Sequence, residues 1–581
     1  TFIRLCSFRG SATQAPRTLE AISSPDCKWR FRASSNDFHK IPGHPIVYWL
    51  GEQLLDLFQT YNSFGDVCKA RRGLTTWDNL KYLRLWFEVA SNRFTPSHTS
   101  CDNLVWVPYN KGGPARRWGN NSLLCVWWVN NGAEIRQRGP ATGEEWYLSP
   151  GITWSGLTSS AVTFRYSQAG FIFDSNKGPM MFPTEKNIYA VLAFLNSSFT
   201  YALLNALNPT LSTQNYDIDR LPYIVDDLDT ESLTDLAKEA VTLSNEDWNS
   251  DETSWEFRRP ICINAETIGS SVKMSVFSAI QTSQKWTRRL REIEADIDSM
   301  ILKSLKLSDV AVDSVPPTAI GIKEGTEEEI VKSLLSYAVG VILGRYSLVI
   351  DGLIYAGSGG IDFDFSMYGE FLPDGDGIVP ITSFPWFEDD LVIKFEAFVS
   401  HCWPIERFEE NLQYIAQAIG AKGGEQSSDT IRRYFNSLFF KEHLQRYKGP
   451  KYPPRPIYWL FSSGKQRAFQ CLVYLHRYNA GTLSRMRTEY VVKLQGKINS
   501  RIEQLESDIP SADSTSHRKK LEKELNTLIK QREELITFDE KLRHYADQRI
   551  ELDLDDGVKV NYGKFGDLLA EVKAITGEKP K

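Results

Sequence analysis

Hydrophobic and polar side chains alternate in the first half of the chain. In residues 152–166, hydrophobic residues occupy alternate positions on both sides of Gly156, with hydroxyl-bearing residues between them. Residues 83–89 repeat this alternation. Because successive side chains of a strand point to opposite faces, the two-residue period predicts a β-rich region.

Three- and four-residue spacing predicts helices further along the chain. Residues 226–248 and 326–346 each begin with hydroxyl-bearing and acidic residues, which are suited to a helix start, and residues 284–305 continue a helical period. The region up to about residue 480 mixes helical and strand patterns. We expect a mixed α/β domain there.

A longer helical repeat near the C-terminus predicts an antiparallel helical hairpin. Apolar residues recur every three or four positions in two runs, which Pro510 and the polar segment PSADSTS separate. Each run has about 27 residues, or roughly 40 Å of helix. A hairpin that packs within the chain and one that docks a partner fit this pattern equally well.

One uncharged segment is long enough to cross a bilayer. It is YAVLAFLNSSFTYALLNAL, residues 189–207. Asn196, Ser197 and Ser198 interrupt its apolar run. We therefore expect a buried helix, and no membrane partner.

The distribution of charge sets residues 61–173 apart from the rest of the chain. They contain twelve Lys or Arg and seven Asp or Glu, about +5, in a chain whose formal net charge is -6. They also hold eight of the sixteen Trp, and no acidic residue occurs from Trp146 to Phe173. A basic, aromatic-rich region suits a polyanion such as DNA. A β-rich domain with Trp in its core remains the alternative.

Cysteine and histidine usage argues against a metal site. The eight Cys form no C-x-x-C pair, and the eight His form no H-E-x-x-H motif. Scattered cysteines without a signal peptide are typical of reduced thiols in a cytosol. We expect no metal and a cytoplasmic protein.

Several longer segments of the sequence resemble those of a known family. The strings GLTTWDNLKYLRLWFEV, GITWSGLTSSAVTFRYSQAGFIFD, RPIYWLFSSGK and GVKVNYGKFGDLL occur in this order. They resemble the target-recognition region and downstream segments of the PglX family, adenine-specific DNA methyltransferases of bacteriophage-exclusion (BREX) defence systems. The sequence departs from that family at Trp77, where related sequences carry Gly.

The resemblance also implies motifs that this sequence lacks. Such enzymes hold S-adenosylmethionine in a Gly-rich loop between a strand and a helix, and grip adenine with an Asn-Pro-Pro-Tyr motif. Here Asn208–Pro209 precedes Thr210, and in AGSGGIDFDF (356–365) the strand period continues past the glycines. We expect no catalytic residue and no cofactor site in this chain, which would be the C-terminal, DNA-specifying half of the enzyme and inactive alone.

The expected fold class is an α+β multidomain chain with a β-rich recognition domain, a helical linker, a mixed α/β domain and a C-terminal antiparallel helical hairpin. The expected bounds are 1–60 for a connector to an upstream methyltransferase domain, 61–225 for the target-recognition domain, 226–310 for the linker, 311–480 for the mixed α/β domain, 481–550 for the spacer-like hairpin and 551–581 for a C-terminal tail. We also expect HPIVYWLGEQLLDLF, residues 44–58 of the connector, to pack on whatever precedes it.

Candidate DNA contacts come from the basic, Gly-rich and hydroxyl-rich segments. Cationic side chains suit phosphates, and polar side chains at strand ends suit base edges. The phosphate-contact candidates are Lys69, Arg71, Arg72, Arg84, Arg116 and Arg117. The base-contact candidates are Thr75, Thr76, Asp78, Asn79, Lys111, Ser155, Thr158, Ser159 and Arg165, with Trp154 packing or wedging.

The resemblance implies double-stranded DNA as a partner, with an upstream methyltransferase domain that binds S-adenosylmethionine. It also allows other BREX proteins or a phage-encoded inhibitor as partners, in a bacterial cytoplasm. Two other functions remain open. One is a specificity module of a restriction-modification enzyme, and the other is a non-catalytic scaffold that contacts other defence proteins.

Overall fold

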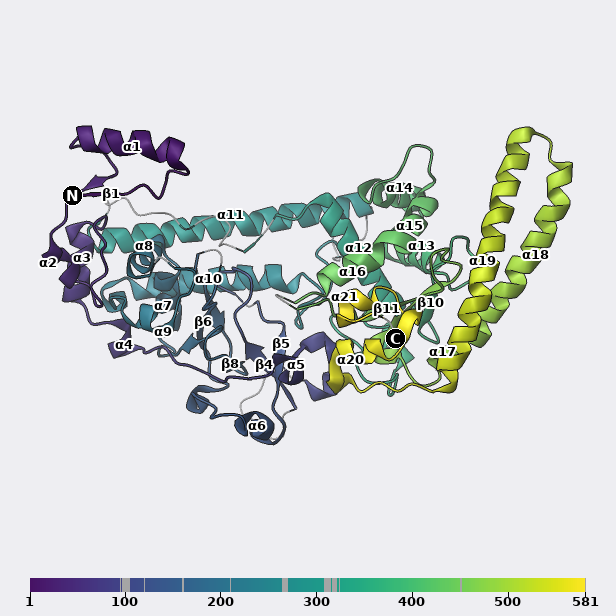
Figure 1. Ribbon diagram of the computed structural model, residues 1–581, viewed down its shortest axis with the longest axis horizontal. Coiled ribbons are helices and arrows are strands. Elements are labelled where there is room, and N and C mark those ends of the chain that lie inside the picture. Colours follow the sequence, from purple (N-terminus) through teal and green to yellow (C-terminus); the bar gives the residue numbers. More distant parts are fainter. Residues whose placement is uncertain are drawn as a thin grey trace.

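The computed structural model describes residues 1–94, 96, 105–119, 121–158, 161–208, 210–263, 270–307, 315, 321–322, 324–449 and 452–579. Helices and several small sheets share the chain, so the α+β class is confirmed (Figure 1). The domain bounds given above stay predictions.

Two small sheets form the β-rich region. The four-stranded sheet is antiparallel except for its last pair, and its spatial order is β3 (Leu83–Leu85), β5 (Leu124–Trp127), β4 (Trp106–Asn110) and β8 (Ile172–Phe173). The antiparallel three-stranded sheet has the order β7 (Phe164–Ser167), β6 (Gly151–Trp154) and β9 (Met180–Met181).

The strand pattern is confirmed in part. Strands β6 and β7 form in the two alternating parts of residues 152–166, as the alternation predicts, and they pair with Thr153 opposite Arg165. Both faces of β6 are buried, so its hydroxyls do not form a solvent-facing row. In residues 83–89 the prediction of a continuous strand is wrong, because Trp86–Glu88 turns into a 3-10 helix.

Shorter elements surround these sheets and lead into them. They are β1 (Phe2–Ile3), α1 (Ser11–Ser23), β2 (Arg30–Phe31), α2 (Ser35–His39), α3 (Glu52–Thr60), α4 (Phe64–Val67), α5 (Asn79–Tyr82), α6 (Val129–Arg136) and α9 (Asn215–Asp219). Val47, Leu54 and Leu55 pack into a core that the chain itself supplies. The prediction that this stretch packs on a preceding domain is therefore wrong for these residues.

The uncharged segment forms two helices instead of one. These are α7 (Ile188–Leu195) and α8 (Ser198–Leu207), which meet at an angle of 66°. Most of their apolar side chains are buried in the same core as Leu54. Among the described residues, no single helix is long and apolar enough to span a bilayer.

Two long helices run along the molecule. Helix α10 (Thr230–Asn249) begins at Asp229, whose carboxylate accepts the Ser232 N–H at 3.2 Å. Helix α11 (Val272–Ser304) extends along the upper edge of the body in Figure 1. Its first half contributes Val272, Val276 and Ala279 to one core, and its second half contributes to another core.

The remaining helices and one sheet enclose the larger core. Helix α12 (Glu327–Ile342) starts at Thr326 with a capping box, as its sequence predicts. The other elements are β10 (Ile378–Pro380), α13 (Leu391–Cys402), α14 (Phe408–Ala418), α15 (Ser427–Tyr434), α16 (Phe440–Arg446), β11 (Tyr458–Ser462), β12 (Gln470–Tyr474), α20 (Gly557–Gly563) and α21 (Val572–Thr576). Their side chains pack with those of residues 85–94 in one core.

The C-terminal hairpin is present; its base packs on the body, and its tip projects from it (Figure 1). Its first arm runs through α17 (Thr482–Arg485), the π-helical segment Met486–Val491 and α18 (Val492–Asp508). Its second arm is α19 (Thr515–Asp547). Buried leucines, among them Leu505 and Leu528, lie between the arms.

An insertion at the hairpin tip is expected to leave stability unchanged. Asp513 is exposed, and Ser514 caps α19 by accepting the His517 N–H at 3.1 Å. Inserting the tripeptide Gly-Ser-Gly between Ala512 and Asp513 preserves that cap, and an exposed turn tolerates extra residues. The melting temperature measured by calorimetry should therefore stay within about 1 °C of the unaltered chain. A drop of several degrees would show that the tip packs on another part of the protein.

Candidate nucleic-acid interface

A cleft of about 820 Å³ lies among the loops of the β-rich region. Three of the candidate base contacts line it, namely Asn79, Lys111 and Thr158. Four segments distant in sequence also contribute: residues 112–115, 121–124 and 452–453, and Lys177. The chain therefore brings together donors and acceptors from separate loops in one hollow.

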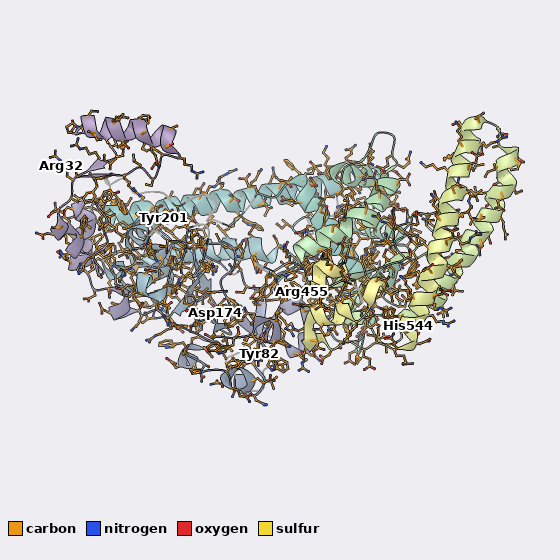
Figure 2. All side chains as sticks on the ribbon, in the orientation of Figure 1. Arg32, Tyr82, Asp174, Tyr201, Arg455 and His544 are labelled. Carbon is orange, nitrogen blue, oxygen red and sulfur yellow. The ribbon has the colours of Figure 1, made fainter. Side chains whose placement is uncertain are left out.

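Asp174, labelled in Figure 2, accepts hydrogen bonds from two residues that line this cleft, Tyr109 and Lys111. One carboxylate oxygen accepts the Lys111 ammonium at 2.6 Å and the Tyr109 hydroxyl at 3.1 Å. The other accepts the backbone N–H groups of Asn176 at 2.9 Å and Lys177 at 2.8 Å. Burial opposes ionisation, but Lys111 and the two N–H groups outweigh it and hold the pKa of Asp174 below its ordinary value.

The turn before α5 presents a second group of polar side chains. The Thr76 hydroxyl donates to the Asn79 side-chain oxygen at 2.6 Å, and the Asp78 carboxylate caps α5 by accepting the Lys81 N–H at 3.1 Å. The Asn79 amide nitrogen has no hydrogen-bond partner within the described chain, and Asn79 lines the cleft. Thr75 is half-buried and Thr76 is buried.

The glycines of the Gly-rich loop are explained by contacts within the chain. Gly112 and Gly113 have φ of 74° and 139°. A Cβ atom at Gly112 would lie 2.5 Å from the Lys177 carbonyl oxygen, and one at Gly113 would lie 2.6 Å from the Asn121 amide nitrogen. The two glycines thus let this loop approach the chain's own backbone and side chains closely.

Arg116 and Arg117 lie inside the molecule, where they join the loop to two helices. The Arg116 guanidinium pairs with Asp247 of α10 at 2.9 Å, and that of Arg117 pairs with Glu294 of α11 at 2.8 Å. Both arginines are buried. In this conformation they hold the loop between β4 and β5 against α10 and α11, and a phosphate contact by either stays a prediction.

The acid-free stretch 152–166 is also largely interior. Trp154, Ser155 and Arg165 are buried, and Arg165 donates to the Ser155 hydroxyl at 3.4 Å. Burial, with a smaller effect from the nearby Arg116 charge, lowers the pKa of Arg165 to about 10. Thr158 lies at the cleft wall, whereas Ser159 lies outside the described residues. Direct base contact by the buried members stays untested.

The remaining phosphate candidates differ in their exposure. Lys69 and Arg72 are exposed, while the Arg71 guanidinium lies over the Trp146 ring at 5.2 Å. Arg84 donates to the backbone carbonyl oxygens of Leu80 at 2.7 Å, Leu83 at 2.8 Å and Asp555 at 3.0 Å. Lys69 and Arg72 therefore have the side-chain freedom that a phosphate contact needs.

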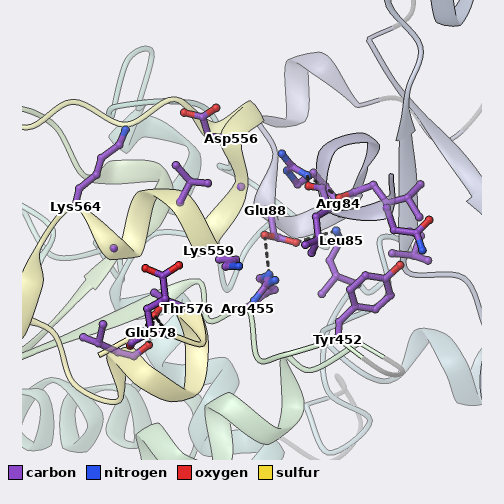
Figure 3. A pocket seen from close by; sticks show the side chains of 18 of the residues that line it. Arg84, Leu85, Glu88, Tyr452, Arg455, Asp556, Lys559, Lys564, Thr576 and Glu578 are labelled. Atoms are coloured by element: carbon purple, nitrogen blue, oxygen red, sulfur yellow. Dashed lines mark hydrogen bonds and ion pairs between the residues drawn. The ribbon is translucent and has the colours of Figure 1, made fainter. Parts of the chain in front are cut away.

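A second cavity of about 520 Å³ adjoins the cleft. The two share Asn79, Leu80, Leu124 and Tyr452 among their lining residues. Figure 3 shows Lys559 beside Arg455, whose guanidinium lies 3.5 Å from the Glu88 carboxylate. Residues from 79–88 and from 556–579, far apart in the sequence, thus line the same cavity.

Sequence reasoning missed several of these residues. Tyr452 lies outside the strings quoted above and Lys559 lies within GVKVNYGKFGDLL, but no local sequence pattern connects either residue to Asn79, with which both line the second cavity. Asp174 did have a signal, because it is the first acidic residue after the acid-free stretch. A lone carboxylate at the end of such a stretch is well placed to pair with a nearby cation.

The segment AGSGGIDFDF does not fit a methyl-donor cradle. Residues 345–364 contain neither strand nor helix, so the expected strand period is wrong, and a 3-10 turn at Phe365–Tyr368 follows. A cofactor loop needs the N-terminus of a helix at this point. Within the described residues, no group of three or more His, Cys, Asp or Glu side chains could hold a metal ion.

Comparison with known proteins identifies relatives over nearly the whole chain. The adenine-specific methyltransferase BrxX of Escherichia coli O9:H4 (strain HS) is 38% identical over 574 residues, which cover 94% of this chain and 46% of BrxX. The adenine-specific methyltransferase PglX of Lacticaseibacillus casei (strain Zhang) is 33% identical over 598 residues, which cover 99% of this chain and 48% of PglX. No protein-family profile matches the chain.

The chain thus spans about half the length of the curated relatives that it matches. Identity of 33% to 38% over so many residues is far above what unrelated chains share. The family that the recognition strings predicted is confirmed: this chain is a homologue of the adenine-specific methyltransferases BrxX and PglX.

Proposed function

We propose that this chain is the DNA-specifying part of an adenine-specific DNA methyltransferase of a BREX phage-defence system. The observation that carries the proposal is the cleft, which Asn79 at the start of α5, Lys111 after β4 and Thr158 after β6 line together. The names of the two relatives support adenine as the methylated base. The function of the whole enzyme would be to mark host DNA.

In this proposal the side chains divide into those that support the site and those that contact DNA. Asp174, Arg116 and Arg117 are committed to ion pairs inside the chain, so they hold the loops in place. The exposed cations Lys69 and Arg72 would contact phosphates. Asn79 would read a base edge, because an Asn amide can pair with adenine in the major groove.

The chemistry would take place outside these residues. S-adenosylmethionine would supply the methyl group, and the target adenine would leave the duplex to reach the catalytic domain. This chain would bind the duplex and orient it, so that the correct adenine is presented. Other BREX proteins and a phage-encoded inhibitor remain proposed partners.

Replacing both Lys69 and Arg72 by Ala is expected to weaken the binding of every duplex alike. Each lost phosphate contact removes about 0.9 from the slope of log affinity against log salt, so the double variant should lose roughly two units of slope. Both side chains are exposed, and the melting temperature should therefore stay unchanged. Titrations of random-sequence duplex at several salt concentrations measure both quantities.

The matched control is Lys523→Ala together with Lys530→Ala, which removes two exposed lysines from hairpin helix α19. Its salt slope should equal that of the unaltered chain. If the unaltered chain fails to bind duplex DNA even at low salt, the proposed function is wrong. A non-catalytic scaffold would be the better description in that case.

A further inference from the structure

Trp77 occupies an unusual turn at the edge of the cleft. The Asp78 N–H donates to the Thr76 carbonyl oxygen at 2.6 Å, which closes a three-residue turn around Trp77. The φ of Trp77 is 59°. Left-handed turns of this tightness are rare and strained for a residue with a Cβ atom. Strain of this kind persists where the surroundings impose it, and it concentrates at functional sites.

The indole of Trp77 gains little from burial. It is 61% exposed, although Trp is among the residues most stabilised by burial. It rests on Gly139, where a Cβ atom would lie 2.8 Å from the indole. The Thr142 hydroxyl donates to the Gly73 carbonyl oxygen at 2.5 Å and holds the loop that carries Gly139 against the turn. The indole ring of Trp77 thus contacts Gly139 and is otherwise largely open to solvent.

The surroundings of Trp77 suit a nucleic acid. Asn79 and Leu80, which follow it by two and three residues, line the cleft. Arg72 is exposed and precedes Trp77 by five residues, and its carbonyl oxygen adjoins the backbone of Gly143. Arg138 is exposed as well, 4.0 Å from the Asp78 carboxylate. A flat aromatic ring among cations is the arrangement that stacks on bases while phosphates are held nearby.

We propose that Trp77 is a base-stacking residue of the DNA interface, with its exposed indole face lying against a nucleobase. This inference rests on the proposed function. It adds to that function a stacking contact that does not depend on the identity of the base, because every base offers a π-face. Trp77 would then stabilise an opened or unstacked base step beside the cleft, where Asn79 reads a base edge.

The test is Trp77→Gly, compared with Trp77→Phe, in the 581-residue chain. Glycine accepts the φ of 59° without strain, so Trp77→Gly should melt at the same temperature as the unaltered chain or higher. Its affinity for random-sequence duplex should fall about ten-fold, with an unchanged salt slope, because the lost contact carries no charge. Trp77→Phe should retain most of the affinity.

The matched control is Phe384→Ala, which removes an aromatic residue that is 58% exposed outside the cleft lining and should leave affinity unchanged. Full affinity of Trp77→Gly for duplex would overturn the inference and leave the proposed function intact, provided that Lys69→Ala/Arg72→Ala still lowers the salt slope. A fall in melting temperature that parallels the loss of affinity would also overturn it, because Trp77 would then be structural. Failure of the unaltered chain to bind duplex would overturn both proposals.

Discussion

Replacing Asp174 by Ala is expected to destabilise the β-rich region by about 3–5 kcal/mol, because it leaves Lys111 as a buried, unpaired cation. The Lys111 side chain is only 9% exposed, and Asp174 Oδ2 lies 2.6 Å from its Nζ. The same change removes the acceptor for the Tyr109 hydroxyl and for two backbone N–H groups. Urea denaturation followed by tryptophan fluorescence measures the loss, and duplex binding should fall with it.

The partner substitution supplies the control for this prediction. In the double variant Asp174→Ala/Lys111→Met no buried charge remains from the pair, so part of the lost free energy of unfolding should return. Asp174→Asn keeps an acceptor and should fall between Asp174→Ala and the unaltered chain. An unfolding free energy of Asp174→Ala equal to that of the unaltered chain would show that the pair is open to water.

The pH dependence of stability has a definite direction for Asp174. Its pKa is lower in the folded chain than in the unfolded chain. Its contribution is therefore complete above the unfolded pKa, about 3.9, and is lost as the pH falls through the folded value. The stability difference between the unaltered chain and Asp174→Asn should be constant near neutral pH and shrink only in acid.

Replacing Arg117 by Met is expected to cost about 3–5 kcal/mol of stability, because Glu294 would lose its counter-ion in a site that is nearly closed to water. Arg117 Nη1 lies 2.8 Å from Glu294 Oε1, and the two side chains are 5% and 13% exposed. Glu294 also accepts the Trp118 indole N–H at 2.9 Å. Thermal and urea denaturation should both report the loss.

A double variant makes this prediction sharper. Arg117→Met/Glu294→Gln removes both charges while the Gln oxygen still accepts the Trp118 indole N–H, so its stability should recover to within about 1 kcal/mol of the unaltered chain. If Arg117→Met is instead as stable as the unaltered chain and its salt slope for duplex falls by about one unit, Arg117 contacts a phosphate. The two roles thus give opposite results.

Local sequence features predicted the helices better than the strands. The capping box at Thr326 and the two runs separated by Pro510 depend on residues within a few positions of each other. The 3-10 turn at Trp86–Glu88 does not, because the Glu88 carboxylate accepts the Leu85 N–H and also the N–H of Val558, 470 residues away. No window of local sequence contains that contact.

The candidate site also combines features that local sequence predicts with features that depend on residues far apart in the chain. The sequence indicated the segments that carry Asn79, Lys111 and Thr158, and these segments do line one cleft. It gave no means to tell an exposed arginine from a buried one. Arg72 and Arg116 both lie in basic, Gly-containing segments, but Arg116 is buried and pairs with Asp247, whereas Arg72 is exposed. That pair joins residues 131 positions apart.

Helix α11 has a consequence for how chains of this kind can exchange parts during evolution. Its residues Val276 and Ala279 belong to one core, and Ile293 and Ile297 belong to the other. Each residue gained or lost between them would turn one core relative to the other by about 100° and shift it by about 1.5 Å. Recombination that swaps recognition segments between related genes should therefore leave the length of α11 unchanged, and the helix should be inherited whole.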